Sequence, residues 1–152
     1  MLVGIDGRAG STRVLEAAGR LAKAIDLPVV VAVVQRFYSD VATVSADAHR
    51  AVQEEIEESV FLQAALALDP LGVRWQFGLA RGEPVRGLCD VADACDAAIV
   101  VIGTRGDGTR SRLHRIFKGS VSSRLVHGQH RPVLVVPPES ARKRVGKLHP
   151  QP

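Results

Sequence analysis

The stretch from Ala97 to Gly106, which reads AAIVVIGTRG, decides the fold. Its six consecutive apolar residues, Ala97–Ile102, predict a short strand that is covered on both faces, as in the centre of a parallel sheet. A glycine-rich loop follows directly, with glycines at 103 and 106. Ligands of open parallel sheets bind outside the carboxyl ends of the strands, so this loop is the first candidate site.

The same alternation of apolar runs and helical patterns extends outward over the chain. In the segment 46–68, Val52, Ile56, Val60 and Ala64 recur every four residues and predict a long amphipathic helix. The sequence predicts an α/β fold: a single doubly wound five-stranded parallel sheet with helices on both faces. The expected strands are Leu2–Ile5, Val29–Val34, Val73–Phe77, Ala97–Ile102 and Pro132–Val136, and the expected helices are 11–25 (capped by Ser11 or Thr12), 46–68, 84–95 and 120–127.

The chain has 152 residues and a net charge of +4 that is unevenly distributed. Residues 1–102 hold 9 Lys+Arg against 14 Asp+Glu, whereas residues 103–152 hold 11 against 2. We expect one domain over residues 1–138 and a basic, disordered tail over residues 139–152. A nucleic-acid groove is disfavoured because no aromatic side chain is interleaved with the basic tail.

Features that the sequence lacks guide the expected cellular compartment and metal chemistry. No apolar run approaches the length of a membrane span, and the N-terminus reads as a strand rather than a signal peptide. Cys89 and Cys95 have no metal-like spacing and are expected to be reduced, packed thiols. Because the sequence lacks both a membrane span and a signal peptide, we expect a cytoplasmic protein. His127 and His130 lack a further ligand, so we predict no metal site.

Two strand ends carry residues suited to an anionic ligand. Asp6 ends the first strand and is followed by the turn Gly7–Gly10. After the fourth strand, glycines let the backbone approach phosphate oxygens, and Gly119-Ser120 opens a helix whose amides favour an anion. The alternative is that the glycines only form a turn and the basic residues only solvate a loop. That loop carries five basic side chains: Arg105, Arg110, Arg112, Arg115 and Lys118.

These motifs resemble the universal stress protein family, UspA-like and of the ATP-binding type. That family's nucleotide-binding members carry Gly-x2-Gly-x9-Gly-Ser/Thr at this point, and here Gly103, Gly106 and Gly119-Ser120 match it. The stretches Val3–Gly7, Arg81–Pro84 and Leu125–His127 agree as well. The resemblance covers residues 2–137 and implies an adenine nucleotide alpha hydrolase-like fold.

The resemblance also implies a ligand, a partner and a role. The ligand would be ATP or another adenine nucleotide, with or without Mg²⁺, and the protein would be a stress-response regulator or binding module. A homodimer would form through the edge strand Pro132–Val136. Asp6 and the backbone of Val33 would face adenine, while Gly103, Gly106, Gly119, Ser120 and Ser122 would hold ribose and phosphates, with Arg105, Arg110 and Lys118 as further phosphate contacts.

One departure from the family pattern keeps alternatives open. Twelve residues, Asp107–Lys118, separate Gly106 from Gly119 where the family has nine. A nucleotide-free dimeric interaction module on the same fold is therefore the second hypothesis. An adenylate-handling enzyme is the third, and it is disfavoured because no nucleophile, base and orienting residue present themselves; slow ATP hydrolysis is the most that we expect.

Overall fold

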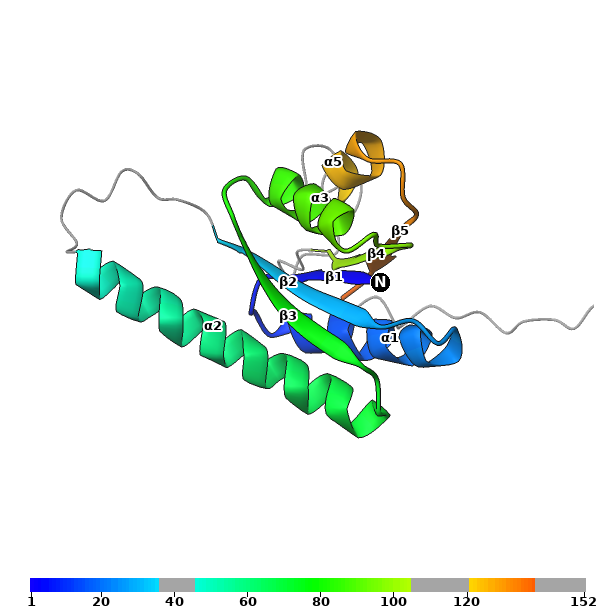
Figure 1. Ribbon diagram of the computed structural model, residues 1–152, viewed down its shortest axis with the longest axis horizontal. Coiled ribbons are helices and arrows are strands. Elements are labelled where there is room, and N and C mark those ends of the chain that lie inside the picture. Colours follow the sequence, from blue (N-terminus) through cyan, green and yellow to red (C-terminus); the bar gives the residue numbers. More distant parts are fainter. Residues whose placement is uncertain (36–45, 105–120, 139–152) are drawn as a thin grey trace, which may run out of the picture.

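A five-stranded, fully parallel sheet with the strand order β3-β2-β1-β4-β5 forms the centre of the computed structural model (Figure 1). The structure describes residues 1–35, 46–104 and 121–138. The strands are β1 (Leu2–Ile5), β2 (Val29–Gln35), β3 (Trp75–Arg81), β4 (Val100–Gly103) and β5 (Val133–Val136). The helices are α1 (Gly10–Ala24), α2 (Ala46–Leu68), α3 (Pro84–Ala94) and α5 (Val121–Gly128), with a 3₁₀ turn η1 (Asp69–Leu71) after α2.

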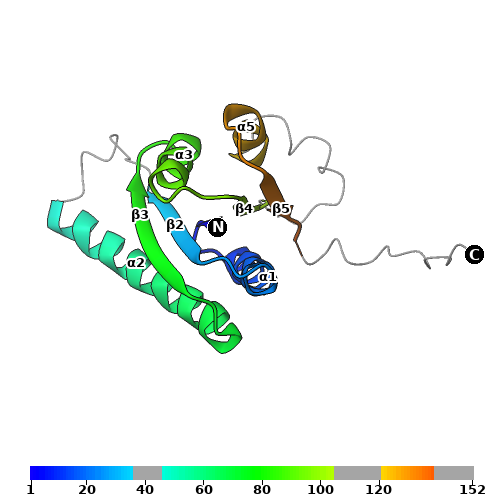
Figure 2. The same cartoon turned by 45° about the vertical axis from the view of Figure 1, so that its right-hand side comes forward.

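Helices cover both faces of the sheet, which confirms the doubly wound α/β architecture. Figures 1 and 2 show α1 and α2 on one face and α3 and α5 on the other. In β1, Val3 packs into the core shared with α1 and α2, while Leu2 packs into the core shared with α3 and α5. Both side chains are fully buried, and each such burial contributes about 1.5–3 kcal/mol. A strand buried on both faces is apolar at nearly every position, as residues 29–34 of β2 show.

Several boundaries differ from the sequence-based expectation, and those of β3, β4 and α1 have a clear physical reason. Strand β3 begins at Trp75 and runs to Arg81, because all seven of its residues pair with β2. Strand β4 begins at Val100 rather than Ala97, since the amide of Ala97 donates to Ala92 O and closes the end of α3. Helix α1 begins at Gly10, and its N-cap residue Ala9 makes no side-chain cap hydrogen bond, so the predicted cap by Ser11 or Thr12 was wrong.

Helix α2 keeps its predicted bounds but is longer than the surface that it covers. Val60, Ala64 and Leu68 are buried against the sheet and α1. One and two turns earlier on the same face, Ile56 and Val52 are 43% and 55% exposed. In Figure 1 the first half of α2 extends past the end of the sheet.

Two ion pairs join the acidic first part of the chain to its basic last third. Arg124 of α5 lies 2.8 Å from Glu83, which precedes α3. Arg131, before β5, pairs with Asp93 near the end of α3. Glu83 also caps α3, because its Oε2 accepts hydrogen bonds from the amides of Val85 and Arg86 at 3.1 and 3.0 Å. A single carboxylate therefore caps one helix and positions the next.

The pKa of Glu83 reflects this double role. Burial by itself raises the pKa, but the backbone hydrogen bonds from Arg86 and Val85 and the charge of Arg124 outweigh it and hold the pKa below its ordinary value of 4.5. Stability gained from this carboxylate is thus present above pH 4.5 and is lost as the pH falls through the lower, folded-state pKa.

Replacing Glu83 with alanine should lower the free energy of unfolding by about 1–2 kcal/mol at pH 7, the usual cost of removing an N-cap. Urea unfolding followed by circular dichroism measures the loss, and the difference from the wild type should shrink below pH 4.5. Glu16→Ala, which removes only an exposed pair with Arg20, is the matched control and should cost less than about 0.5 kcal/mol. Equal losses for the two variants would contradict this role of Glu83.

Candidate functional site

The order of the strands reverses between β1 and β4. The predicted site residues that the structure describes lie near the carboxyl ends of β1, β4 and β2. In β1, Ile5 pairs with Val33 of β2, and on its other side Gly4 pairs with Ile102 of β4. Asp6, which follows β1, and Gly103, which ends β4, therefore lie at the same edge of the sheet. In open α/β sheets this edge, at the reversal, is the usual place for a ligand.

Asp6 is held by the turn that follows β1. Its Oδ1 accepts hydrogen bonds from the amide of Arg8 and from the hydroxyl of Ser11, both at 3.2 Å. Its Oδ2 lies 3.7 Å from Arg8 Nε, and half of the side chain remains exposed. The carboxylate is thus fixed in direction but still open to solvent, as a ligand contact requires.

Gly7 makes this turn possible for two reasons. Its φ is +75°, in the left-handed region that favours glycine. A Cβ at this position would also lie 2.8 Å from Val60 Cγ2 of α2. The turn is tied to α2 a second time, because Gln63 Nε2 donates to Thr12 Oγ1 at 2.9 Å and to Arg8 O at 3.4 Å.

The end of β4 lies close to both α1 and α5. A Cβ on Gly103 would lie 2.8 Å from Val14 Cγ2, so β4 and α1 approach each other closely at this point. The hydroxyl of Ser122, in a residue that is only 5% exposed, donates to Gly103 O at 3.5 Å. In this arrangement Ser122 ties the start of α5 to the end of β4.

Four of the predicted site residues are described by the structure, and six are not. Val33 is almost fully buried in β2, level with the last residue of β1, so only its backbone lies at the edge. The positions and contacts of Asp6, Gly103 and Ser122 are those described above. The other six, Arg105, Gly106, Arg110, Lys118, Gly119 and Ser120, lie outside the described residues, as does the tail over residues 139–152.

Two polar residues at this edge were not predicted as site residues from the sequence. Ser11 is the partner of Asp6, and its role is visible only once β1 and α1 are placed side by side. Thr104 follows Gly103; its amide donates to Val136 O at 3.2 Å, and its buried Oγ1 has no hydrogen-bond partner among the residues that the structure describes. The position of Thr104 inside the glycine-rich motif was the signal that could have found it.

Thiol and metal chemistry find no support among the described residues. Cys89 and Cys95 are both free, and burial, with the charges of Asp93 and Asp90, raises the pKa of the Cys89 thiol. Cys89 is therefore not an activated thiolate. Within residues 1–35, 46–104 and 121–138, no three His, Cys, Asp or Glu side chains group as metal ligands would. In the same residues, no helix combines the length and the apolar character that a membrane crossing needs.

Curated relatives match parts of the chain. A universal stress protein of Synechocystis sp. is 40% identical over 65 residues, which cover 43% of this chain and 40% of that protein. One of Methanocaldococcus jannaschii is 32% identical over 85 residues, or 56% and 48% of the two chains. The matches thus span less than half the length of either relative.

Solved structures match over nearly the full length. The crystal structure of a universal stress protein in complex with cAMP is 26% identical, covers 89% of this chain and 94% of its own, and has a TM-score of 0.64. A family member from Burkholderia pseudomallei, at 24% identity, covers 90% and 93% with a TM-score of 0.69 and supports the fold. The family model described as "Universal stress protein family" matches residues 1–137, and the chain therefore belongs to the universal stress protein family.

Proposed function

We propose that the chain binds an adenine nucleotide at the carboxyl edge between β1 and β4, and that binding changes its conformation or its choice of partner in a stress response. The observation that carries the proposal is Asp6, a half-exposed carboxylate that Gly7 and Ser11 hold at the point of strand reversal. The 26% identical universal stress protein in complex with cAMP supports an adenine nucleotide as the ligand.

The residues present fit such a ligand. A carboxylate only accepts hydrogen bonds, and the exocyclic amine of adenine only donates them, so Asp6 suits adenine and opposes the O6 of guanine. The buried Thr104 Oγ1 has no partner within the described part of the chain, and it is a hydroxyl in the residue next to Gly103. Gly103, Gly106, Gly119 and Ser120 would bind the ribose and the phosphates. Ser122 would stabilise the end of β4 through its hydrogen bond to Gly103 O. If Mg²⁺ accompanies the nucleotide, the phosphates supply part of its ligands.

Asp6→Asn should weaken ATP binding by about tenfold or more, because a hydrogen bond to a charged group is worth roughly 1.5–3 kcal/mol. Isothermal titration calorimetry with ATP and GTP measures both affinity and base preference. The wild type should prefer ATP, and the variant should lose much of that preference.

Asp26→Asn is the matched control. Asp26 lies after α1, near the amino ends of the strands, and its φ of 51° suits asparagine. ATP affinity should be unchanged in this variant. Equal affinity for ATP and GTP in the wild type, or equal losses in the two variants, would contradict the role of Asp6.

The basic residues of the segment 105–118 are proposed to contact phosphates rather than the base. Replacing Arg110 and Lys118 with glutamine should therefore weaken ATP binding several-fold and leave adenosine binding unchanged. Raising the salt concentration should weaken ATP binding in the wild type more than in this double variant. A parallel loss for ATP and adenosine would show that the two residues act on folding or on the base instead.

A homodimer through β5 is the second part of the proposal. This strand is an edge of the sheet, and an edge presents unpaired backbone groups that favour pairing with another chain. Leu134, on β5, is 37% exposed. Pairing with a second β5 would satisfy those groups and cover this side chain.

Leu134→Asp should shift the protein from dimer to monomer, which light scattering coupled to size-exclusion chromatography measures. Val126→Asp is the control: Val126 is 51% exposed but lies on α5, away from the backbone edge. A monomeric wild type, or loss of the dimer in the Val126 variant alone, would contradict a dimer through β5.

A further inference from the structure

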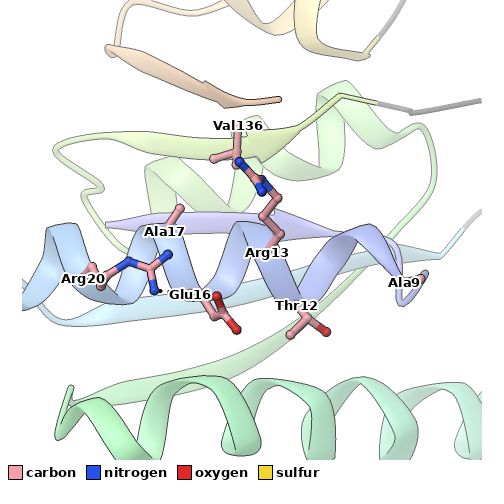
Figure 3. Close-up of a pocket in the computed structure, with 7 residues that line it drawn as sticks. All are labelled: Ala9, Thr12, Arg13, Glu16, Ala17, Arg20 and Val136. Carbon is pink, nitrogen blue, oxygen red and sulfur yellow. Dashed lines mark ion pairs between the residues drawn. The ribbon is translucent and has the colours of Figure 1, made fainter. Parts of the chain in front are cut away.

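A groove of about 620 Å³ lies between α1 and the end of β5 and adjoins the proposed nucleotide site. Its lining begins at Ala9, the N-cap residue of α1, which belongs to the turn that holds Asp6. On the other side it reaches Val136, the last residue of β5. Figure 3 shows Arg13 extending from α1 toward Val136. We call this cavity the α1–β5 groove.

The residues assigned to the nucleotide follow a line across the carboxyl ends of the strands, and the groove lies at the end of that line. Val33 lies on β2, Asp6 follows β1 and Gly103 ends β4. Val136 pairs with Gly103 from the next strand, β5. Neighbouring strands lie about 4.8 Å apart, so the line from β2 to β5 is about 14 Å long. With the base at β2 and β1 and the ribose at β4, the phosphates would extend toward β5 and the groove.

Arg13 brings a cation to this end of the line. The residue is half-buried, and its buried Nε makes no hydrogen bond to any residue that the structure describes. Thr104 has a buried Oγ1 in the same condition, and its amide donates to Val136 O at 3.2 Å. Arg13 and Thr104 therefore both lie beside Val136, one from α1 and one from the end of β4.

The hydrogen-bonding character of these two groups favours a phosphate. A guanidinium N–H can only donate, and a hydroxyl can donate as well as accept. Phosphate oxygens accept hydrogen bonds, and their negative charge and spacing match the planar fork of an arginine. A phosphate beside Val136 would thus supply acceptors for Arg13 and Thr104 together.

Arg20 lies on the same side of α1 but is placed differently. It is exposed, and its Nη1 lies 3.6 Å from Glu16 Oε2. A helix rises 1.5 Å per residue, so Arg20 lies about 10 Å further along α1 than Arg13 and away from the carboxyl ends of the strands. Arg20 therefore serves as a natural control for Arg13.

We propose that Arg13 binds the phosphate chain of the nucleotide beyond its first phosphate, and that the site consequently prefers adenosine di- and triphosphates to AMP and adenosine. The inference rests on the proposed nucleotide site and adds to it the class of ligand. It gives α1 a direct part in binding, beside the glycine-rich motif.

Isothermal titration calorimetry with ATP, ADP, AMP and adenosine tests the contact. Arg13→Gln should weaken the binding of ATP and ADP by about tenfold, because it removes a charged hydrogen-bond donor, and should leave AMP and adenosine binding unchanged. Arg13→Lys keeps the charge but loses the planar fork, so it should recover part of the lost ATP affinity. Arg20→Gln should leave all four affinities unchanged.

Three results would overturn the contact while the nucleotide site stands. These are equal affinity of the wild type for ATP and AMP, equal losses of ATP affinity in Arg13→Gln and Arg20→Gln, and a parallel loss for all four ligands in Arg13→Gln. If the wild type binds none of the four ligands, the proposed function fails and the inference fails with it.

A second readout uses the wild type alone and does not depend on how the variants fold. The Arg13 Nε–Hε resonance should shift when ATP is added and should stay in place with adenosine. An unchanged resonance at an ATP concentration that saturates the site, or the same shift with adenosine, would also overturn the inference.

Discussion

The pairing of β1 on both sides is the constraint on which the rest of the structure depends. Because β1 is bonded to β2 and to β4, the chain leaves β1 toward one edge of the sheet and returns through β4 toward the other. In open α/β sheets, ligands bind at the carboxyl ends of the strands where the order reverses in this way. The close approaches at Gly7 and Gly103 then bring Asp6 and the end of β4 to the same edge.

The sequence pattern predicted the elements whose structure depends mainly on residues close to them in the sequence. The four-residue repeat of α2 predicted the correct bounds of the helix, and the apolar runs predicted the five strands but not their spatial order. The ends of β3 and β4 could not be predicted, because they depend on which backbone carbonyl accepts a hydrogen bond from each amide. Ser11 looked like a helix cap by position alone, but Asp6 of the preceding strand competes for its hydroxyl. Of the candidate site, the sequence identified Asp6 and Gly103 but not Thr104, whose missing partner is visible only in three dimensions.

The uneven distribution of charge has a structural use as well as a proposed functional one. Two arginines of the basic last third pair with Glu83 and Asp93 of the acidic part, and these contacts join α3 to α5 and to the start of β5. In the acidic part, Arg13 has a buried Nε that makes no hydrogen bond to the described residues. The remaining basic charge of the last third divides between the segment 105–118, which we propose contacts phosphates, and the tail.

Native mass spectrometry of the purified chain with millimolar ATP or GTP tests the central claim, adenine-nucleotide binding at the β1–β4 edge, most directly. The account predicts one ATP per chain, a much weaker adduct with GTP, and loss of the ATP adduct in Asp6→Asn but not in Asp26→Asn. No ATP adduct in the wild type, or equal adducts with both nucleotides, would contradict it and would favour a nucleotide-free interaction module on the same fold.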